Sequence, residues 1–150
     1  MHRIGLLGAS KIARGAVIAP AKNNPDFEVV AVGARDAARA RAYADEHGIP
    51  HVAGSYAELV ARDDVDVVYN ALPPAGHAEW TIAALGAGKA VLCEKPFAMN
   101  ADEARAMTAA ATIALASPAF IAKGFSQSTV LPASSAAMVH SACPEGGRAL

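Results

Sequence analysis

Short apolar runs alternate along the first two thirds of the chain with longer segments in which apolar residues recur every three or four positions. The short runs are typical of buried strands and predict strands at 3–8, 27–32, 51–52, 65–72 and 90–93. The longer segments predict helices over 11–21 and 75–86, after Asp36 and Ser55, and from Asn100 to about Ala111. This alternation predicts an α/β fold, with one parallel sheet covered by helices on both faces.

Capping residues support three of these helices. Asp36 stands directly before a helical pattern and Gly48 directly after it, as an N-cap and a C-terminal glycine should. Ser55 and Asn100 are each followed three residues later by a glutamate, which is the pattern of a capping box. These helix starts therefore rest on local chemistry as well as on periodicity.

The chain loses charge and helical periodicity after about Ala111. From Thr112 onward only Lys123, Glu145 and Arg148 are charged, and serine becomes frequent. We therefore predict a folded domain over 1–111 and a low-charge tail over 112–150. The tail is expected to hold one extra strand at 118–125 and to be irregular elsewhere.

Composition and charge narrow the range of partners. A chain of 150 residues suits one domain, and a net charge of −1 gives no reason to expect nucleic acid or an acidic membrane as partner. Cys93 and Cys143 form no disulfide framework, which fits a reduced, cytoplasmic setting. The histidines lack the spacing of metal ligands, so no metal is expected. Neither a signal peptide nor a membrane span is predicted.

The turn after the first predicted strand matches a dinucleotide-binding fingerprint with two departures. The segment reads Gly8-Ala9-Ser10-Lys11-Ile12-Ala13, so serine and alanine replace the second and third glycines. Gly8 would make the tight turn, and the Ser10 hydroxyl can hydrogen-bond a phosphate. The first-turn amides and the helix dipole would then bind the pyrophosphate. The alternative is an ordinary tight turn between a strand and a helix.

The end of the second predicted strand bears on the choice between NAD and NADP. An enzyme selective for NAD usually has a carboxylate there, which holds the ribose 2′-hydroxyl. Gly33 and Ala34 occupy those places, and Arg35, which follows, can pair with the extra phosphate of NADP. The alternative is that Arg35 is only solvated and Asp36 is the carboxylate. We favour Asp36 as a helix cap, and hence NADP.

The end of the fourth predicted strand carries further candidate ligands. Asn70 and the backbone at Leu72 and Pro73 lie at the strand's carboxyl end, and His77 falls in the first turn of the next helix. Open α/β sheets bind ligands at this edge, so we expect these residues near a nucleotide. For His77, a structural contact and a direct role in chemistry both remain open.

The fifth predicted strand ends abruptly in an acid, a base and a proline, Glu94-Lys95-Pro96. Lys95 therefore lies at the carboxyl end of a strand. An amine in this position can hold a substrate oxygen, donate a proton or pair with a phosphate. The alternative is a surface lysine that happens to follow a strand.

These motifs, in this order and spacing, resemble the Gfo/Idh/MocA oxidoreductases, the glucose–fructose oxidoreductase and inositol dehydrogenase family. The resemblance covers about residues 1–111 and rests on the turn at 8–13, Leu72-Pro73-Pro74 with His77, Ala87-Gly88-Lys89, and Cys93 to Pro96. It implies a Rossmann-type doubly wound sheet that binds NADP or, alternatively, NAD. It further implies that Lys95 acts as a catalytic residue near the nicotinamide and a sugar or polyol oxygen, and that Glu94 helps to place it.

The resemblance also implies a second domain, which covers the nicotinamide, contacts the substrate and carries the usual oligomer interface. The tail from Thr112 does not resemble that domain, so we expect the domain and its interface to be missing. One explanation is a shifted reading frame or a truncated gene. The other is a genuine nucleotide-binding module with a new ending.

Three functions follow. The first is an NADP-dependent oxidoreductase acting on a sugar or polyol, with this chain as its cofactor domain and with little or no turnover by itself. The second is a non-enzymatic dinucleotide-binding or regulatory module. A Rossmann domain with another ligand, such as a methyltransferase, fits the Glu94-Lys95-Pro96 segment less well.

Overall fold

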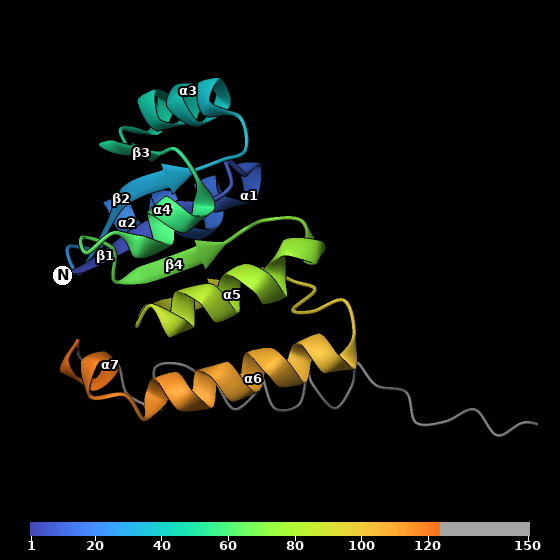
Figure 1. Ribbon diagram of the computed structural model, residues 1–150. Helices are drawn as coiled ribbons and strands as arrows, with labels where there is room; N and C mark the ends of the chain where they lie inside the picture. The colour runs from blue at the N-terminus through green and yellow to red at the C-terminus, as the bar shows by residue number, and fades with distance from the viewer. Residues whose placement is uncertain (124–150) are drawn as a thin grey trace, which may run out of the picture.

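A computed structural model describes residues 1–123 and confirms the α/β architecture (Figure 1). The elements, in chain order, are β1 (His2–Leu7), α1 (Lys11–Ala13), the π-helical turn η1 (Arg14–Ile18), α2 (Ala19–Lys22), β2 (Phe27–Gly33), α3 (Ala37–His47), β3 (His51–Ala53), α4 (Tyr56–Ala61), β4 (Val67–Asn70), the 3-10 turn η2 (Pro74–Gly76), α5 (His77–Gly86), β5 (Ala90–Cys93), α6 (Ala101–Leu115) and α7 (Pro118–Ala122). All predicted strands up to 93 are present, with bounds shifted by a few residues at most.

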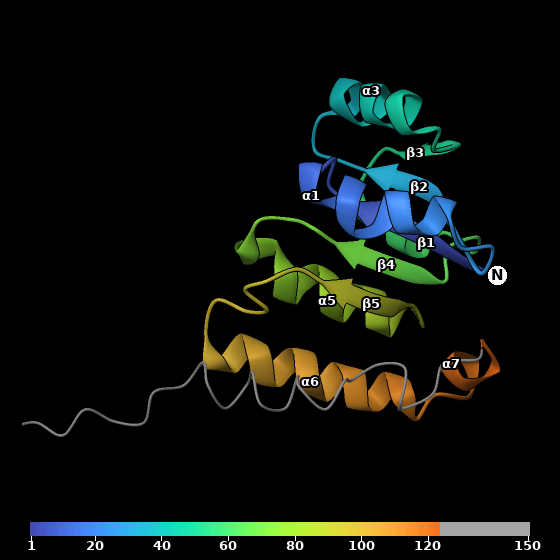
Figure 2. The ribbon, with the colours of Figure 1, turned by 180° about the vertical axis from the view of Figure 1, so that it is seen from behind.

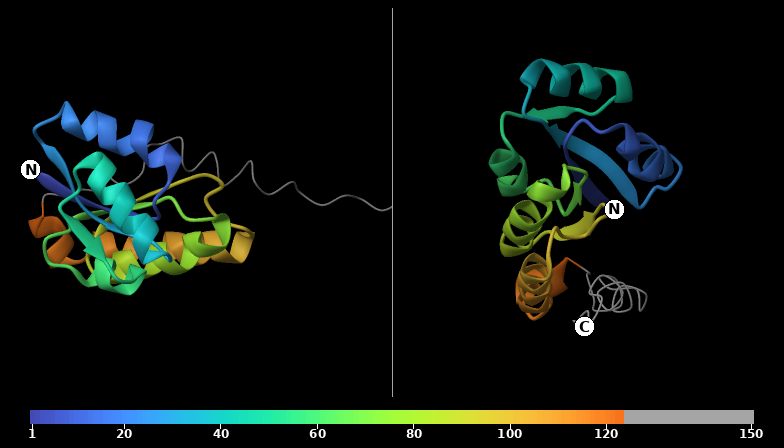
Figure 3. Two further views of the ribbon diagram at one scale, coloured as in Figure 1. Left: turned by 90° about the horizontal axis from the view of Figure 1, so that it is seen from above. Right: turned by 90° about the vertical axis from the view of Figure 1, so that its right-hand side faces the viewer.

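The five strands form one parallel sheet in the order β3-β2-β1-β4-β5. Strand β1 is thus central, with β2 and β3 on one side of it and β4 and β5 on the other. This is the doubly wound order of a Rossmann fold. The helical run 11–22 lies on the opposite side of the sheet from α4 and α5 (Figure 3, right). Seen from behind, that run lies in front of β1 (Figure 2).

Strand alternation sends apolar side chains into a separate core on each face of the sheet. On one face Ile4 and Leu6 of β1 pack with Val17 of the helical run 11–22 and Ala44 of α3. On the other face Leu7 packs with residues of α4 and α5. Because both faces are covered, the central strands are apolar over most of their length, as is typical of a parallel sheet.

The predicted caps are confirmed in atomic detail. The Asp36 carboxylate accepts a hydrogen bond from the Arg39 amide at 2.9 Å, and Ser55 and Asn100 accept likewise from Glu58 and Glu103. Gly48 ends α3 in the left-handed conformation, with φ 71°. These ends formed as predicted because each cap needs only residues within four positions.

The prediction for the region after Ala111 is wrong over residues 112–122. Helix α6 continues to Leu115, since alanine favours a helix even without an amphipathic pattern. The strand expected at 118–125 is helix α7 as far as Ala122. Pro118 suits the first position of a helix, and Phe120 is fully buried against Leu85 and Ala114. The rest of the predicted tail lies outside the described residues.

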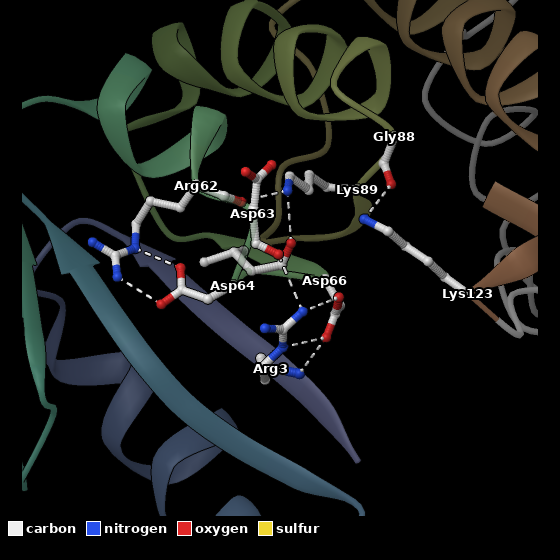
Figure 4. A network of polar contacts seen from close by, with 9 residues as sticks. Arg3, Arg62, Asp63, Asp64, Asp66, Gly88, Lys89 and Lys123 are labelled. Carbon is white, nitrogen blue, oxygen red and sulfur yellow. Dashed lines mark hydrogen bonds and ion pairs between the residues drawn. The ribbon is translucent and has the colours of Figure 1, made fainter. Parts of the chain in front are cut away.

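A polar network closes the amino-terminal edge of the sheet (Figure 4). The Arg3 guanidinium binds both carboxylate oxygens of Asp66 at 3.0 Å, and the Arg3 amide donates to the same carboxylate. Lys89 is buried and donates to the carbonyls of Arg62 and Val65. This network joins β1 and β4 at the edge opposite their carboxyl ends. No helix among residues 1–123 has both the length and the apolarity needed to cross a bilayer.

Candidate functional site

The candidate residues gather at the carboxyl ends of four strands. Gly8 follows β1, Arg35 follows β2, Leu72 follows β4 and Glu94 follows β5. Since all strands are parallel, their carboxyl ends and the loops that follow lie along one edge of the sheet, which is to the right in Figure 1. The topology therefore brings together residues that are up to 86 positions apart, as the sequence predicts.

Gly8 makes the tight turn that leads from β1 into the first helix. Its φ is +94°, a conformation that side-chain-bearing residues rarely adopt. A Cβ atom at this position would lie 3.3 Å from Leu72 Cδ2 and 3.5 Å from the Ala71 carbonyl oxygen. The turn after β1 thus packs closely against the end of β4. Hydrogen bonds from the Gly8 amide to the Gly33 carbonyl, 2.7 Å, and from the Ser10 amide to the Gly8 carbonyl, 2.9 Å, fix its path.

Ser10 replaces a glycine of the fingerprint without backbone strain. Its φ of −97° and ψ of 137° are extended, so this position does not require glycine. The Ser10 Oγ accepts a hydrogen bond from the Ile12 amide at 3.2 Å and caps the helix. A hydroxyl that accepts in this way still has its own proton to donate. Lys11 and Ile12 follow at the surface, with Ile12 53% exposed.

Arg35 lies at the surface, two residues after the end of β2. Within residues 1–123 its side chain makes no hydrogen bond or ion pair, whereas the neighbouring Asp36 is engaged as the cap of α3. The guanidinium is therefore available to an anionic ligand. The Asp36 carboxylate has a structural partner, as predicted.

Two residues of α3 that the sequence did not single out contact the turn after β1. Arg39 donates from Nη2 to the Ala9 carbonyl, and Tyr43 donates from its hydroxyl to the Ser10 carbonyl, each at 2.8 Å. Their spacing of four residues places both side chains on one face of α3, the only sequence signal that could have indicated them. Helix α3 is therefore tied to the backbone of this turn by two side-chain hydrogen bonds.

Asn70 is fully buried at the end of β4 and organises the loop that follows. Its amide nitrogen donates to the His77 carbonyl at 3.2 Å and to the Thr81 hydroxyl at 3.3 Å. Its side-chain oxygen accepts from the Leu72 amide at 3.3 Å. Asn70 thus ties β4 to the start of α5 and shapes the backbone at Leu72 and Pro73 from beneath the surface.

His77 connects two loops of the site. It is 1% exposed, and its two ring nitrogens each lie 2.8 Å from a backbone carbonyl, Leu72 on one side and Pro96 on the other. The imidazole therefore holds the loop after β4 against the loop after β5. Both ring nitrogens therefore have protein partners, which corresponds to the structural contact that the sequence left open beside a direct role in chemistry.

Glu94 is fixed by a tyrosine that the sequence analysis also did not single out. The buried Tyr69 hydroxyl donates to Glu94 Oε1 at 2.5 Å, and the Lys95 amide lies 3.3 Å from Glu94 Oε2. Burial and the adjacent Glu94 carboxylate raise the pKa of Tyr69 above its ordinary value, so the phenol stays protonated as a donor. The hydrogen bond from Tyr69, a residue of β4, therefore fixes the orientation of the Glu94 side chain.

Lys95 lies at the surface after this fixed glutamate. It precedes a cis peptide bond to Pro96, whose carbonyl faces His77. Among the described residues, none binds the Lys95 ammonium, so the group is open to a ligand. Within the same range no three histidine, cysteine or acidic side chains gather as a metal site would require.

Comparison with known proteins is consistent with this geometry. Residues 2–114 match the family model described as "Oxidoreductase family, NAD-binding Rossmann fold", the Gfo/Idh/MocA family. The chain belongs to this family. Its members' Rossmann domain accounts for the strand order and for the motifs that the sequence analysis identified.

Several relatives of the Gfo/Idh/MocA family are similar over the same region. D-xylose 1-dehydrogenase (NADP(+)) 2 from Haloferax volcanii is 48% identical over 103 residues, which cover 69% of this chain and 31% of the relative. The 1,5-anhydro-D-fructose reductase of Ensifer adhaerens is 48% identical over 111 residues, 74% of this chain and 33% of the relative. The chain thus spans about a third of the length of these oxidoreductases.

A solved structure of a 3-ketoreductase shares the fold. KijD10 from Actinomadura kijaniata, in complex with NADP and TDP-benzene, superposes with a TM-score of 0.69 at 38% identity. The match covers 75% of this chain and 34% of KijD10. A Gfo/Idh/MocA Rossmann domain of this kind binds a nicotinamide dinucleotide, and its relatives are oxidoreductases.

Proposed function

We propose that this chain is the NADP-binding domain of an oxidoreductase that transfers a hydride to or from a sugar- or polyol-like carbon bearing oxygen. The observation that carries the proposal is the convergence of the Gly8 turn, Arg35 and Lys95 at one edge of the sheet. The printed activities of the relatives, a xylose dehydrogenase and an anhydrofructose reductase, support the substrate class.

The turn after β1 fits a pyrophosphate. Gly8 has a φ of +94°, which allows the tight turn that a pyrophosphate-binding loop needs at this position. The Ser10 hydroxyl and the first-turn amides are donors, and the helix dipole favours an anion here. We assign Gly8 to Ile12 to the pyrophosphate, and the backbone at Leu72 and Pro73 to the adjoining part of the dinucleotide.

Arg35 supports NADP as the preferred cofactor. Its guanidinium is exposed and unpaired within residues 1–123, and the strand end beside it carries no carboxylate for a ribose 2′-hydroxyl. A guanidinium can bind a 2′-phosphate through two parallel hydrogen bonds. The NADP bound in KijD10 and the NADP in the name of the Haloferax relative are in keeping with this choice.

Lys95 is the residue that we propose for proton handling at the substrate oxygen. The bound cofactor would supply the hydride chemistry, and the protein must then orient the substrate and supply an acid or base. The fixed Glu94 carboxylate, held by Tyr69, supports a role for Glu94 in placing the backbone of Lys95. Asn70 and His77 contribute by holding the two loops that flank this position.

The exposure of Lys95 favours little or no turnover by this chain alone. Proton transfer by an amine is most effective where water is excluded, and Lys95 is exposed among the described residues. The same observation favours the second candidate function, a non-enzymatic dinucleotide-binding or regulatory module. Turnover with a panel of sugars and polyols separates the two functions.

Titration with NADPH and NADH, followed by nicotinamide fluorescence, tests the cofactor assignment. We expect tighter binding of NADPH, and Arg35→Ala should weaken it about tenfold or more, because a hydrogen bond to a charged group contributes about 1.5–3 kcal/mol. NADH affinity should be little changed. Arg41→Ala, which removes another exposed arginine, is the matched control. Failure of the folded chain to bind either dinucleotide would refute the proposal.

A further inference from the structure

Helix α3 is connected to two parts of the proposed dinucleotide site, Arg35 and the turn after β1. It begins directly after Arg35 and Asp36, and its inner face sends Arg39 and Tyr43 to the turn after β1. Both bonds end on backbone carbonyls, those of Ala9 and Ser10. The contacts therefore depend on the path of the turn and not on its side chains.

Holding a carbonyl also orients the amide on the same peptide unit. A trans peptide is planar, with its C=O and N–H pointing in opposite directions. Tyr43 holds the Ser10 carbonyl toward α3, so the Lys11 N–H of that peptide points away from α3. Lys11 is the first residue of its helix, and its amide has no carbonyl four residues back within the helix. This amide is thus a donor whose direction Tyr43 sets.

Tyr43 is well suited to this task over a wide pH range. Burial raises the pKa of its phenol above the ordinary value, with a smaller contribution from Glu46, so the hydroxyl remains a donor. The ring contacts His47 edge-on, with centroids 4.4 Å apart, which limits its movement. Arg39 holds the preceding peptide in a similar way, and its own amide is held by Asp36.

From this geometry we propose that Tyr43, together with Arg39, is a positioning residue for the pyrophosphate of the dinucleotide. The pair holds the turn after β1 in the form that presents the Lys11 amide to the ligand. The inference rests on the proposed function, because it assigns a task within that same site. A purely structural Tyr43 would stabilise α3 without changing dinucleotide affinity.

Replacement of the hydroxyl alone separates these two roles. Tyr43→Phe keeps the ring and removes the donor to Ser10. We expect NADPH and NADH to bind about three- to tenfold more weakly, as loss of one hydrogen bond implies, with their affinity ratio unchanged because both carry the pyrophosphate. Adenosine 2′-monophosphate, which lacks the pyrophosphate, should bind as it does to the wild type.

Tyr56→Phe is the matched control. Tyr56 lies on α4, contacts Trp80 edge-on and makes no hydroxyl hydrogen bond with the residues that the structure describes, so this change should leave both affinities unaltered. Arg39→Met is a second variant that removes the donor to Ala9. It should weaken NADH binding, a readout free of any charge effect at the 2′-phosphate.

The outcomes are distinct. If the folded variants Tyr43→Phe and Arg39→Met bind both dinucleotides as tightly as the wild type does, this inference is overturned and the proposed function stays intact. A weakening confined to NADPH would also overturn it, because the effect would then lie at the 2′-phosphate. Absence of dinucleotide binding by the folded wild type would overturn both.

Discussion

Asp66 links the stability of the fold to pH at the scale of a single residue. Burial alone would raise the pKa of this carboxyl, but the hydrogen bonds and the positive charge of Arg3 outweigh burial and lower the pKa below its ordinary value of 3.8. A carboxyl with a lowered pKa stabilises the folded state when ionised. The stabilisation is complete above the ordinary value and is lost as the pH falls from there through the folded-state pKa.

Asp66→Asn should therefore lower the free energy of unfolding at neutral pH by about 1–3 kcal/mol, as expected for hydrogen bonds to a charged group. The difference from wild type should shrink below about pH 4, where the carboxyl of the unfolded chain becomes protonated while that of the folded protein is still ionised. Urea unfolding at a series of pH values measures this. Asp102→Asn is the control, because Asp102 pairs with Arg105 on the exposed surface of α6 and its loss should change little. A difference independent of pH would contradict the account.

At the scale of elements, Gly48 shows what ends α3. Its φ of 71° is left-handed, and a Cβ atom built there would meet nothing within 4 Å. The cost of a side chain is thus one of backbone conformation alone. Gly48→Ala should lower the free energy of unfolding by about 1 kcal/mol.

Gly86→Ala provides the opposite expectation in the same assay. Gly86 closes α5, also has open space around its Cα, and is not in the left-handed region. Alanine should stabilise this helix by up to about 1 kcal/mol. Chemical denaturation of Gly48→Ala and Gly86→Ala measures the change in the free energy of unfolding for each. Destabilisation by both substitutions to the same extent would contradict the assignment of the cost at Gly48 to its left-handed conformation.

The elements that the sequence predicted well are those whose signals are local. Asp36, Ser55 and Asn100 cap helices through residues three positions away, so the sequence contains the whole interaction. Residues 118–122 were assigned to the wrong class because the burial of Phe120 against α5, β5 and α6 decides there, and no local pattern reveals that packing.

The contrast between local signals and contacts of distant segments also holds for the candidate site. Gly8, Arg35 and Lys95 could be placed from the sequence, because parallel strands bring their carboxyl ends to one edge. The bridge from His77 to the carbonyls of Leu72 and Pro96 depends on how two loops meet in space. The hydrogen bonds of Tyr43 to the turn and of Tyr69 to Glu94 likewise join segments more than 20 residues apart, which periodicity does not reveal.

At the scale of the whole molecule, the two edges of the sheet have different tasks. The amino-terminal edge is closed by the network of Arg3, Asp66 and Lys89, which satisfies buried polar groups. The carboxyl-terminal edge carries the partly exposed hydroxyl of Ser10 and the exposed cations of Arg35 and Lys95. This asymmetry supports a structural role for the amino-terminal edge and a ligand site at the carboxyl-terminal edge.

Backbone amide chemical shifts during titration with NADPH test the central claim most directly, and a chain of 150 residues suits this measurement. We predict saturable shifts at Gly8 to Ile12, Arg35, Leu72 and Lys95, all at the carboxyl-terminal edge, with Arg3, Asp66 and Lys89 unaffected. Adenosine 2′-monophosphate should shift the amides near Arg35 alone. Shifts that fall mainly at the amino-terminal edge, or none at millimolar NADPH, would contradict the assignment of this chain as a dinucleotide-binding domain.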